Sequence, residues 1–141
     1  MPHLITMNEW MDGTPKSLNH PMTTEQLYRK QTMNLNNIPF GTTDWSTIPV
    51  TAHTGDTGVA HWRTQQFDVI RVRMVEYSAG YVADHWCSKG HVLLCLSGEL
   101  HTELDDGRTF TLTAGMSYQV ADHAEAHRSS TPTGATLFIV D

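Results

Sequence analysis

Positively charged residues are scarce in this sequence. Nine Lys and Arg stand against fifteen Asp and Glu among 141 residues, which gives a formal net charge of −6 with histidine neutral. The few cationic residues form no cluster, so we expect no surface that binds nucleic acid or an anionic membrane. No apolar stretch approaches the roughly 18 residues that a transmembrane helix needs. Nucleic acid and membrane are therefore excluded as expected partners.

Cysteine is rare as well. The sequence contains only Cys87 and Cys95, which are too few for a disulfide scaffold and suit a reducing compartment. The first ten residues lack the cationic patch and apolar run of a signal peptide, so a cytoplasmic location is expected. With 39% apolar and 17% charged residues, the composition is that of a globular chain with one core.

Proline is absent between Pro49 and Pro132. Over this stretch apolar residues alternate in short runs, which is the period of half-buried strands. Asp106-Gly107 is a strong hairpin signal, and Ser97-Gly98 is expected to be another turn. The pattern predicts an all-β fold, an antiparallel barrel or sandwich. The expected strands cover residues 58–64, 67–77, 91–96, 99–104, 108–113, 116–120, 127–131 and 135–140.

Residues 1–32 differ from the rest of the chain. They contain three of the six prolines and scattered polar residues with little periodicity, so we expect an extension with little fixed structure. Within it, residues 23–31 are a candidate short helix that Thr23 would cap. The expected folded domain covers residues 33–141.

Histidine, in contrast, is abundant, with nine residues in all and five of them from His85 to His127. His85 and Cys87 are two apart, so on an extended segment they point the same way. His91 begins the next expected strand after Gly90, and His127 opens a later strand that could approach across a barrel. Imidazole and thiolate are good ligands for zinc, iron and copper. Together they predict a metal site, although any one of these histidines alone is more often a surface or hydrogen-bonded residue.

Five other residues are candidates for a pocket near this site. Arg71 and Arg73 could form a carboxylate-binding fork inside a barrel. The alternative for this pair is a solvated strand face, and that is the interpretation we favour. Tyr81, Trp86 and Tyr118 fall near the candidate metal site, where they either line the pocket or simply pack.

Two further residues of the metal-binding types are expected to lie outside the site. Cys95 lies in an apolar run, where a free cysteine is most often a buried small hydrophobe. His101 shares a strand face with Glu99 and Glu103, and the alternation with neighbouring leucines predicts that this face meets solvent.

The region around the histidines has the spacing of a known motif. His85 and Cys87 fall on the two histidines of a His-x-His pair, and His91 falls on the glutamate that follows. Gly98 closes the motif, while Gly80 precedes His85 by one residue fewer than is usual. This arrangement resembles the first motif of the cupins, with two of its usual ligands replaced.

A second cupin motif is also recognisable. Gly115 opens it, Ala121 takes the place of its proline, and His127 takes the place of its histidine after one extra residue. More narrowly, Asp84-His85-Trp86-Cys87 resembles the signature of the small bacterial cupins called DHCW-motif proteins. The resemblance runs from near Met33 to the end of the chain.

The resemblance implies a jelly-roll-like, cupin-type antiparallel β-barrel that holds one divalent transition metal on His85, Cys87, His91 and His127. Because this ligand set has no carboxylate, zinc and iron are the first candidates and copper and nickel the next. Two arrangements stay open. Four protein ligands would close the site, whereas three histidines would leave open positions and Cys87 beside the metal. The second is similar to cupins that activate oxygen, the thiol dioxygenases among them.

Two classes of function follow from the resemblance. One is a metal-dependent enzyme, of oxygenase or isomerase type, that acts on a small molecule in the barrel pocket. The other is a module that binds or senses a metal or small ligand without turnover, because one fold hosts many activities. Small cupins commonly form homodimers, so a homodimer is also expected, with residues 34–50 as a candidate for covering the partner.

Overall fold

The computed structural model describes residue 21, residues 23–25 and residues 35–141. Its contacts divide the chain into two units, Met1–Leu35 and Asn36–Asp141. The predicted extension over residues 1–32 and the predicted boundary after it lie almost entirely outside the described residues. Of the predicted helix over residues 23–31, Thr24 and Glu25 are described and are helical.

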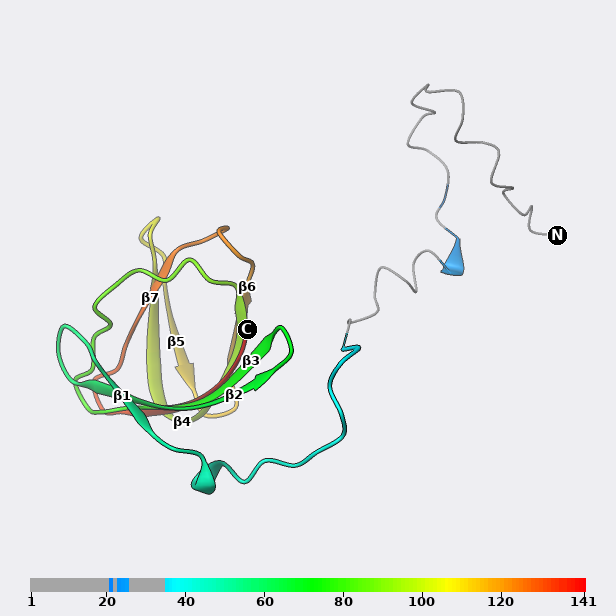
Figure 1. The fold of residues 1–141 in the computed structure, drawn as a ribbon. Helices are drawn as coiled ribbons and strands as arrows, with labels where there is room; N and C mark the ends of the chain where they lie inside the picture. The colour runs from blue at the N-terminus through cyan, green and yellow to red at the C-terminus, as the bar shows by residue number, and fades with distance from the viewer. Residues whose placement is uncertain (1–20, 22, 26–34) are drawn as a thin grey trace. The chain divides into compact units, whose positions relative to one another are not determined.

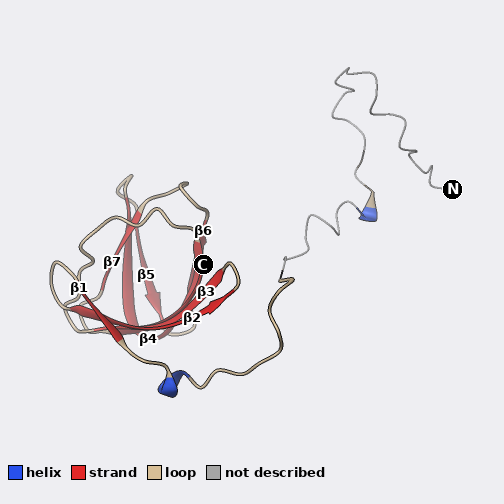
Figure 2. Cartoon of the chain, viewed as in Figure 1, coloured by secondary structure: helices blue, strands red, loops and turns tan. Residues whose placement is uncertain are grey.

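The unit Asn36–Asp141 consists mainly of β-strands (Figure 2). Among the described residues, no helix is long and apolar enough to cross a membrane. The elements are η2 (Trp45–Thr47), β1 (Thr51–Thr54), β2 (Val59–Phe67), β3 (Ile70–Tyr77), β4 (His91–Leu104), β5 (Thr109–Thr113), β6 (Ser117–Val120), β7 (His127–Ser130) and β8 (Ala135–Val140).

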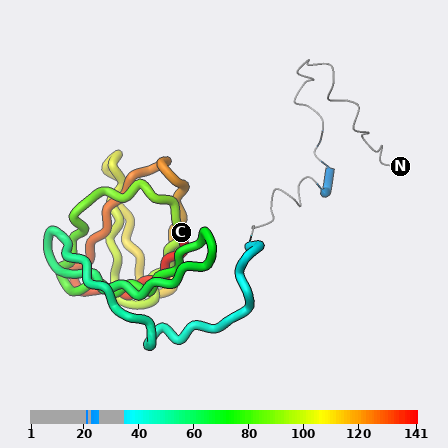
Figure 3. The backbone as a smooth tube through the Cα atoms, in the orientation of Figure 1, coloured from blue at the N-terminus to red at the C-terminus, as the bar shows by residue number. Residues whose placement is uncertain are grey.

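The strands form one antiparallel sheet that curves into a barrel (Figures 1 and 3). The strand order is β1-β2-β3-β8-β4-β5, and β6 and β7 also pair with β4. β4 is therefore the central strand: its first half pairs with β6 and β8, and its second half pairs with β5 and β7. The predicted all-β antiparallel barrel is confirmed.

Two predicted strand boundaries were wrong. Ser97-Gly98 is not a turn, because β4 continues through it with a shift of register after Cys95. Gly98 has φ 77°, and a Cβ there would lie 2.1 Å from the carbonyl oxygen of Gly134, so this bulge requires glycine. The predicted strand over residues 67–77 is interrupted at Asp68, φ 54°, where β2 turns into β3.

The register of the sheet places an apolar core at one level of the barrel. Val75 of β3 lies opposite Leu137 of β8, which lies opposite Cys95 of β4, and all three are 0% exposed. Full burial of a large apolar side chain contributes about 1.5–3 kcal/mol. The burial of Cys95 confirms the prediction that it is a small core residue.

Further along the same inner face, the residues become polar. Side chains two apart on a strand share a face, so Arg73 and Arg71 follow Val75 along β3. Asp141 exchanges two backbone hydrogen bonds with Arg71, at 2.6 and 2.9 Å. His91 begins β4 at the same level, one residue before the pairing of β4 with β8 begins. The sheet itself thus brings two arginines, a carboxylate and a histidine together.

Candidate metal centre and its cavity

A cavity of about 320 Å³ lies inside the barrel. Its lining includes Cys87, His91 and His127 together with Arg71 and Arg73. A volume of this size accommodates a small molecule. Among the sixteen lining residues are also four aromatic residues, which make the remaining wall largely apolar: Trp62, Tyr77, Tyr81 and Tyr118.

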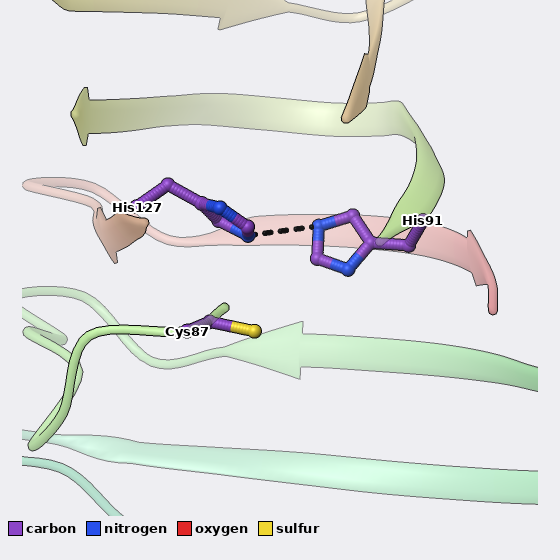
Figure 4. A group of neighbouring side chains, drawn as sticks. All are labelled: Cys87, His91 and His127. Atoms are coloured by element: carbon purple, nitrogen blue, oxygen red, sulfur yellow. Dashed lines mark hydrogen bonds between the residues drawn. The ribbon is translucent and has the colours of Figure 1, made fainter. Parts of the chain in front are cut away.

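Three predicted ligands converge in this cavity. The Sγ atom of Cys87 and one ring nitrogen from each of His91 and His127 all lie within 4.8 Å of one another (Figure 4). The two Nε2 atoms are 3.1 Å apart. His91 is 9% exposed and His127 is 3% exposed, so both imidazoles are sheltered from water. We call these three residues the metal cluster.

The backbone fixes each member of the metal cluster. His91 is the first residue of β4 and His127 the first residue of β7, while Cys87 and His127 exchange backbone hydrogen bonds of 2.8 and 2.9 Å. Gly90 donates its N–H to Asp122 Oδ1 at 2.7 Å, and a Cβ on Gly90 would lie 2.5 Å from the Asp122 nitrogen. The close approach of the backbone before His91 to the segment at Asp122 therefore depends on glycine.

The donor geometry of the metal cluster fits a transition metal. Tetrahedral zinc with Zn–N bonds of about 2.05 Å holds two ring nitrogens about 3.3 Å apart, close to the separation of the Nε2 atoms of His91 and His127. His127 Nδ1 donates to the Glu125 carbonyl at 2.9 Å, which leaves its Nε2 free to bind a cation. His91 Nε2 also lies 2.9 Å from the hydroxyl of Tyr118. One thiolate and two imidazoles favour zinc, iron or copper over magnesium or calcium.

The electrostatics of the metal cluster favour the metal-binding forms of Cys87 and His91, whereas His127 is held toward its protonated form, which a metal would have to displace. The hydrogen bond from His127 lowers the pKa of Cys87, against the opposing effect of burial, and the same bond raises the pKa of His127. Burial, together with the nearby charges of His127 and Arg73, lowers the pKa of His91 to about 4. His91 is therefore neutral near pH 7, and Cys87 ionises more readily than an ordinary thiol.

His85 lies outside the metal cluster. Its Nδ1 is 2.6 Å from Asp84 Oδ1, and its side chain is 69% exposed, although it borders the cavity. Trp86 is 43% exposed and is not among the described residues that line the cavity. Of the aromatic candidates, Tyr81 and Tyr118 do line it. His101, predicted to face solvent, has a side chain that is 44% exposed and bonded to Glu99.

The second polar group in the cavity is an ion-pair network that we call the arginine cluster. Arg71 donates from Nε and Nη2 to the two carboxylate oxygens of Asp141, both at 2.7 Å, and Arg73 Nη2 donates to Asp141 Oδ2 at 2.8 Å. Arg73 is 6% exposed, so the favoured interpretation of a solvated face is wrong for it. The inward alternation that buries Val75 also buries Arg73.

Sequence reasoning missed Asp141, Trp62 and Tyr77. The guanidinium of Arg73 lies over the Trp62 ring, 4.4 Å from its centroid, and Tyr77 stacks on Tyr81 at 4.2 Å. Asp141 comes directly after β8 and continues the two-residue alternation of that strand, on the same face as its inward-pointing apolar residues. That alternation was the available signal, and it places a carboxylate on the inner face next to Arg71.

Comparison with known proteins identifies the fold through solved structures. No protein-family profile matches the sequence, and no curated protein matches it. A predicted oxalate decarboxylase from Thermotoga maritima is 14% identical, with a TM-score of 0.61 over 71% of this chain and 96% of that one. An RmlC-like cupin from Shewanella frigidimarina is 22% identical, with a TM-score of 0.57 over 74% and 91%. The EutQ protein of Clostridium difficile is 15% identical, with a TM-score of 0.59 over 70% and 83%. At these identities the likeness shows a shared fold.

Proposed function

We propose that this chain, which has the cupin fold, is a small metal-dependent enzyme whose metal is held by Cys87, His91 and His127. Its substrate is a small molecule that enters the barrel cavity, and the reaction is of oxygenase or isomerase type. Zinc or iron is the first expected metal, and copper or nickel the next. A bound metal would act as a Lewis acid toward a molecule in the cavity.

One observation carries this proposal: three metal-binding atoms from separate segments meet at the wall of a cavity that can admit a substrate. Three protein ligands with an open position are typical of catalytic sites, whereas structural zinc sites usually have four. The predicted fourth ligand of a closed site is His85, but its side chain is 69% exposed and it does not belong to the group of ligand atoms that lie within 4.8 Å of one another. This geometry supports the enzyme over the alternative, a module that binds or senses without turnover.

Elemental analysis of the full chain, purified without added metal, tests the metal site. We expect about one transition-metal ion per chain in the wild type and almost none in the His91→Ala, His127→Ala double variant, because ligand loss removes the chelate. His101→Ala is the matched control, since His101 lies on β4 outside the metal cluster. Full retention of metal by the double variant would show that these residues are not the ligands.

Cobalt substitution then separates an enzyme from a closed binding module. The visible absorption of cobalt(II) reports its coordination, so azide should change the spectrum if one position is exchangeable. A spectrum that azide leaves unchanged would indicate a closed site and favour the module. His85→Ala completes the test: we expect it to keep the metal, and loss of metal would make His85 the fourth ligand.

The expected homodimer also belongs to this proposal. Several large apolar side chains are partly exposed on the barrel, among them Val92 at 54% and Leu96 at 41% on β4. Pairing such a surface with a second copy would remove it from water. Light scattering at micromolar concentration should give the mass of two chains, and a monomer alone would contradict the expectation.

A further inference from the structure

The arginine cluster offers more positive charge and more donors than its own carboxylate uses. Asp141 accepts hydrogen bonds from Arg71 Nε, Arg71 Nη2 and Arg73 Nη2. A guanidinium carries five N–H groups, so several donors of the two arginines are left over. Arg73 Nε is buried and has no hydrogen-bond partner among the described residues. Both arginines line the cavity.

The charge balance points to an anion. The side chains of the arginine cluster, two guanidiniums and one carboxylate, carry a net charge of +1 next to the cavity. Arg73 is only 6% exposed, and a buried charge is costly unless it is paired. With a divalent metal on the thiolate of Cys87 and two neutral imidazoles, the metal cluster would add a further +1. The loaded cavity then suits a ligand with one or two negative charges.

The geometry specifies the kind of anion. Asp141 shows that the paired guanidiniums accommodate a planar carboxylate. Arg71 binds it through two parallel hydrogen bonds, the bidentate geometry typical of arginine. The Trp62 ring lies against Arg73 at 4.4 Å from ring centroid to guanidinium carbon, which limits the orientations of this group. A fixed guanidinium plane favours a carboxylate approaching in that plane.

We propose that Arg71 and Arg73 bind the carboxylate of a small organic acid in the cavity, beside the metal cluster. This assignment names the substrate class of the proposed enzyme. It rests on the proposed function only where it treats the bound acid as a substrate, because binding itself requires no turnover. No residue of the arginine cluster belongs to the metal cluster, so carboxylate binding itself can be measured in metal-free protein. Asp141 then limits the affinity, because it competes for the same guanidinium groups.

Calorimetric titration of the full chain with malonate tests this inference, and malonamide serves as the uncharged match. Glycolate and glycolamide repeat the comparison with one carboxylate. Each titration is made on metal-free and on zinc-loaded protein. We expect each acid to bind at least about tenfold more tightly than its amide, because hydrogen bonds between charged groups are the strong ones. Equal binding of acid and amide would overturn the proposal, as would binding of inorganic phosphate with no binding of either acid.

Variants identify the residues responsible. Arg71→Gln and Arg73→Gln should each weaken malonate binding at least about tenfold. Arg63→Gln is the matched control, since Arg63 pairs with Glu76 at 3.6 Å and is not among the cavity-lining residues. Circular dichroism verifies folding, and Arg71→Gln is the safer variant because its side chain is 35% exposed. Wild-type affinity in a folded Arg71→Gln variant would refute the assignment.

Substituting Asp141 gives a result of opposite sign. Asp141→Asn removes the competing negative charge and raises the net charge of the arginine cluster from +1 to +2, so malonate should bind several-fold more tightly. Zinc content is measured on the same samples. Zinc bound without any carboxylate binding would overturn this inference alone, whereas carboxylate binding without zinc binding would overturn the proposed metal function alone.

Discussion

The metal cluster and the arginine cluster share one cavity, but different parts of the backbone hold them. Arg71 and Arg73 lie on β3 and Asp141 follows β8, so paired strands of one sheet fix their positions. The metal cluster takes Cys87 from the segment before β4, where an isolated bridge pairs it with His127. His91 pairs with Val120 of β6, and His127 pairs with Leu104 at the other end of β4. Strand register fixes the whole of the first cluster, whereas the second also depends on the segment outside the strands that carries Cys87.

The two clusters also differ in how well their polar atoms are satisfied. Asp141 accepts three charged hydrogen bonds and its side chain is 0% exposed. In the metal cluster, the Nε2 atoms of His91 and His127 face each other, and His91 Nδ1 is buried without a partner among the residues described. The carboxylate of the arginine cluster is therefore satisfied within the chain, although the buried Arg73 Nε is left without a partner among the described residues, whereas the facing Nε2 atoms of the metal cluster leave a place for a cation. Stability should depend mainly on the first, and metal content on the second.

The largest expected effect is on stability. Asp141→Ala leaves two guanidiniums, one of them buried, without their carboxylate. Breaking a buried ion pair by removing one partner costs about 3 kcal/mol, and urea unfolding of the metal-free chain measures that loss. Glu76→Ala is the control, because the Arg63–Glu76 pair is 3.6 Å long and its glutamate side chain is 59% exposed. We expect a change within about 0.5 kcal/mol there. Equal losses of unfolding free energy in the two variants would show that the ion pairs of Asp141 stabilise the fold no more than an exposed surface pair does.

The next effect is on metal affinity. Cys87→Ser replaces a soft thiolate by a hydroxyl that does not ionise near pH 7, so zinc should bind at least about tenfold more weakly. Competition with a chromophoric chelator measures the affinity, and Cys95→Ala, in the core, should leave it unchanged. If Cys87→Ser keeps the affinity but abolishes sensitivity to oxidation, then Cys87 is a neighbour of the metal and not its ligand.

The sequence predicts the barrel well because apolar side chains recur at every second residue of a half-buried strand. That period revealed β2 to β8 with small errors at their ends, but it could not separate a bulge from a turn. Ser97-Gly98 looks the same in both, and the difference depends on whether β8 keeps pairing with these two residues, as it does with Thr136 and Ala135. β1 was missed because Thr51–Thr54 has too few apolar residues to alternate.

The candidate site was predictable in part for the same reason. Cys87, His91 and His127 were recognised from their residue types and spacing, and they converge. His85 was expected to point the same way as Cys87, but the chain bends at Asp84-His85, so the two-residue period does not hold there. The burial of Arg73 was not expected, because its ion-pair partner lies 68 residues away and only the fold brings the two together.

Acid should affect the two clusters in separate pH ranges. Burial alone would raise the pKa of Asp141, but the hydrogen bonds of Arg71 and the charges of both arginines outweigh it and lower that pKa. A carboxyl whose folded pKa is lowered stabilises the fold above its unfolded pKa of about 3.9, and this stabilisation is lost as pH falls through the folded value. Zinc should leave earlier, because the raised pKa of His127 lets protons compete for that imidazole at a higher pH than for the carboxylate of Asp141, whose pKa is lowered.

Zinc release and circular dichroism, followed together from pH 8 to pH 2, measure this separation. We expect metal loss first and unfolding at a clearly lower pH. Asp141→Asn should remove the part of the acid dependence below about pH 4, since asparagine does not titrate. Coincident release and unfolding in the wild type would mean that the metal, and not the arginine cluster, controls acid stability.

The smallest expected effect links metal binding to Tyr118. Its hydroxyl lies 2.9 Å from His91 Nε2, the atom that we expect to bind the metal. Tyr118→Phe should destabilise the metal-free chain by about 1 kcal/mol, because a buried hydrogen bond is lost. A metal on Nε2 would break that bond in the wild type anyway, so the metal-bound form loses less.

Zinc affinity should consequently rise in the Tyr118→Phe variant, by no more than about fivefold, which is the factor that 1 kcal/mol corresponds to. Tyr81→Phe is the matched control, because Tyr81 lines the same cavity but stacks on Tyr77 at 4.2 Å. We expect no change of zinc affinity there. A fall in affinity in Tyr118→Phe would show that the hydroxyl supports the metal-bound form. The metal would then lie where His91 keeps its bond to Tyr118, and the assignment of Nε2 as its ligand atom would be wrong.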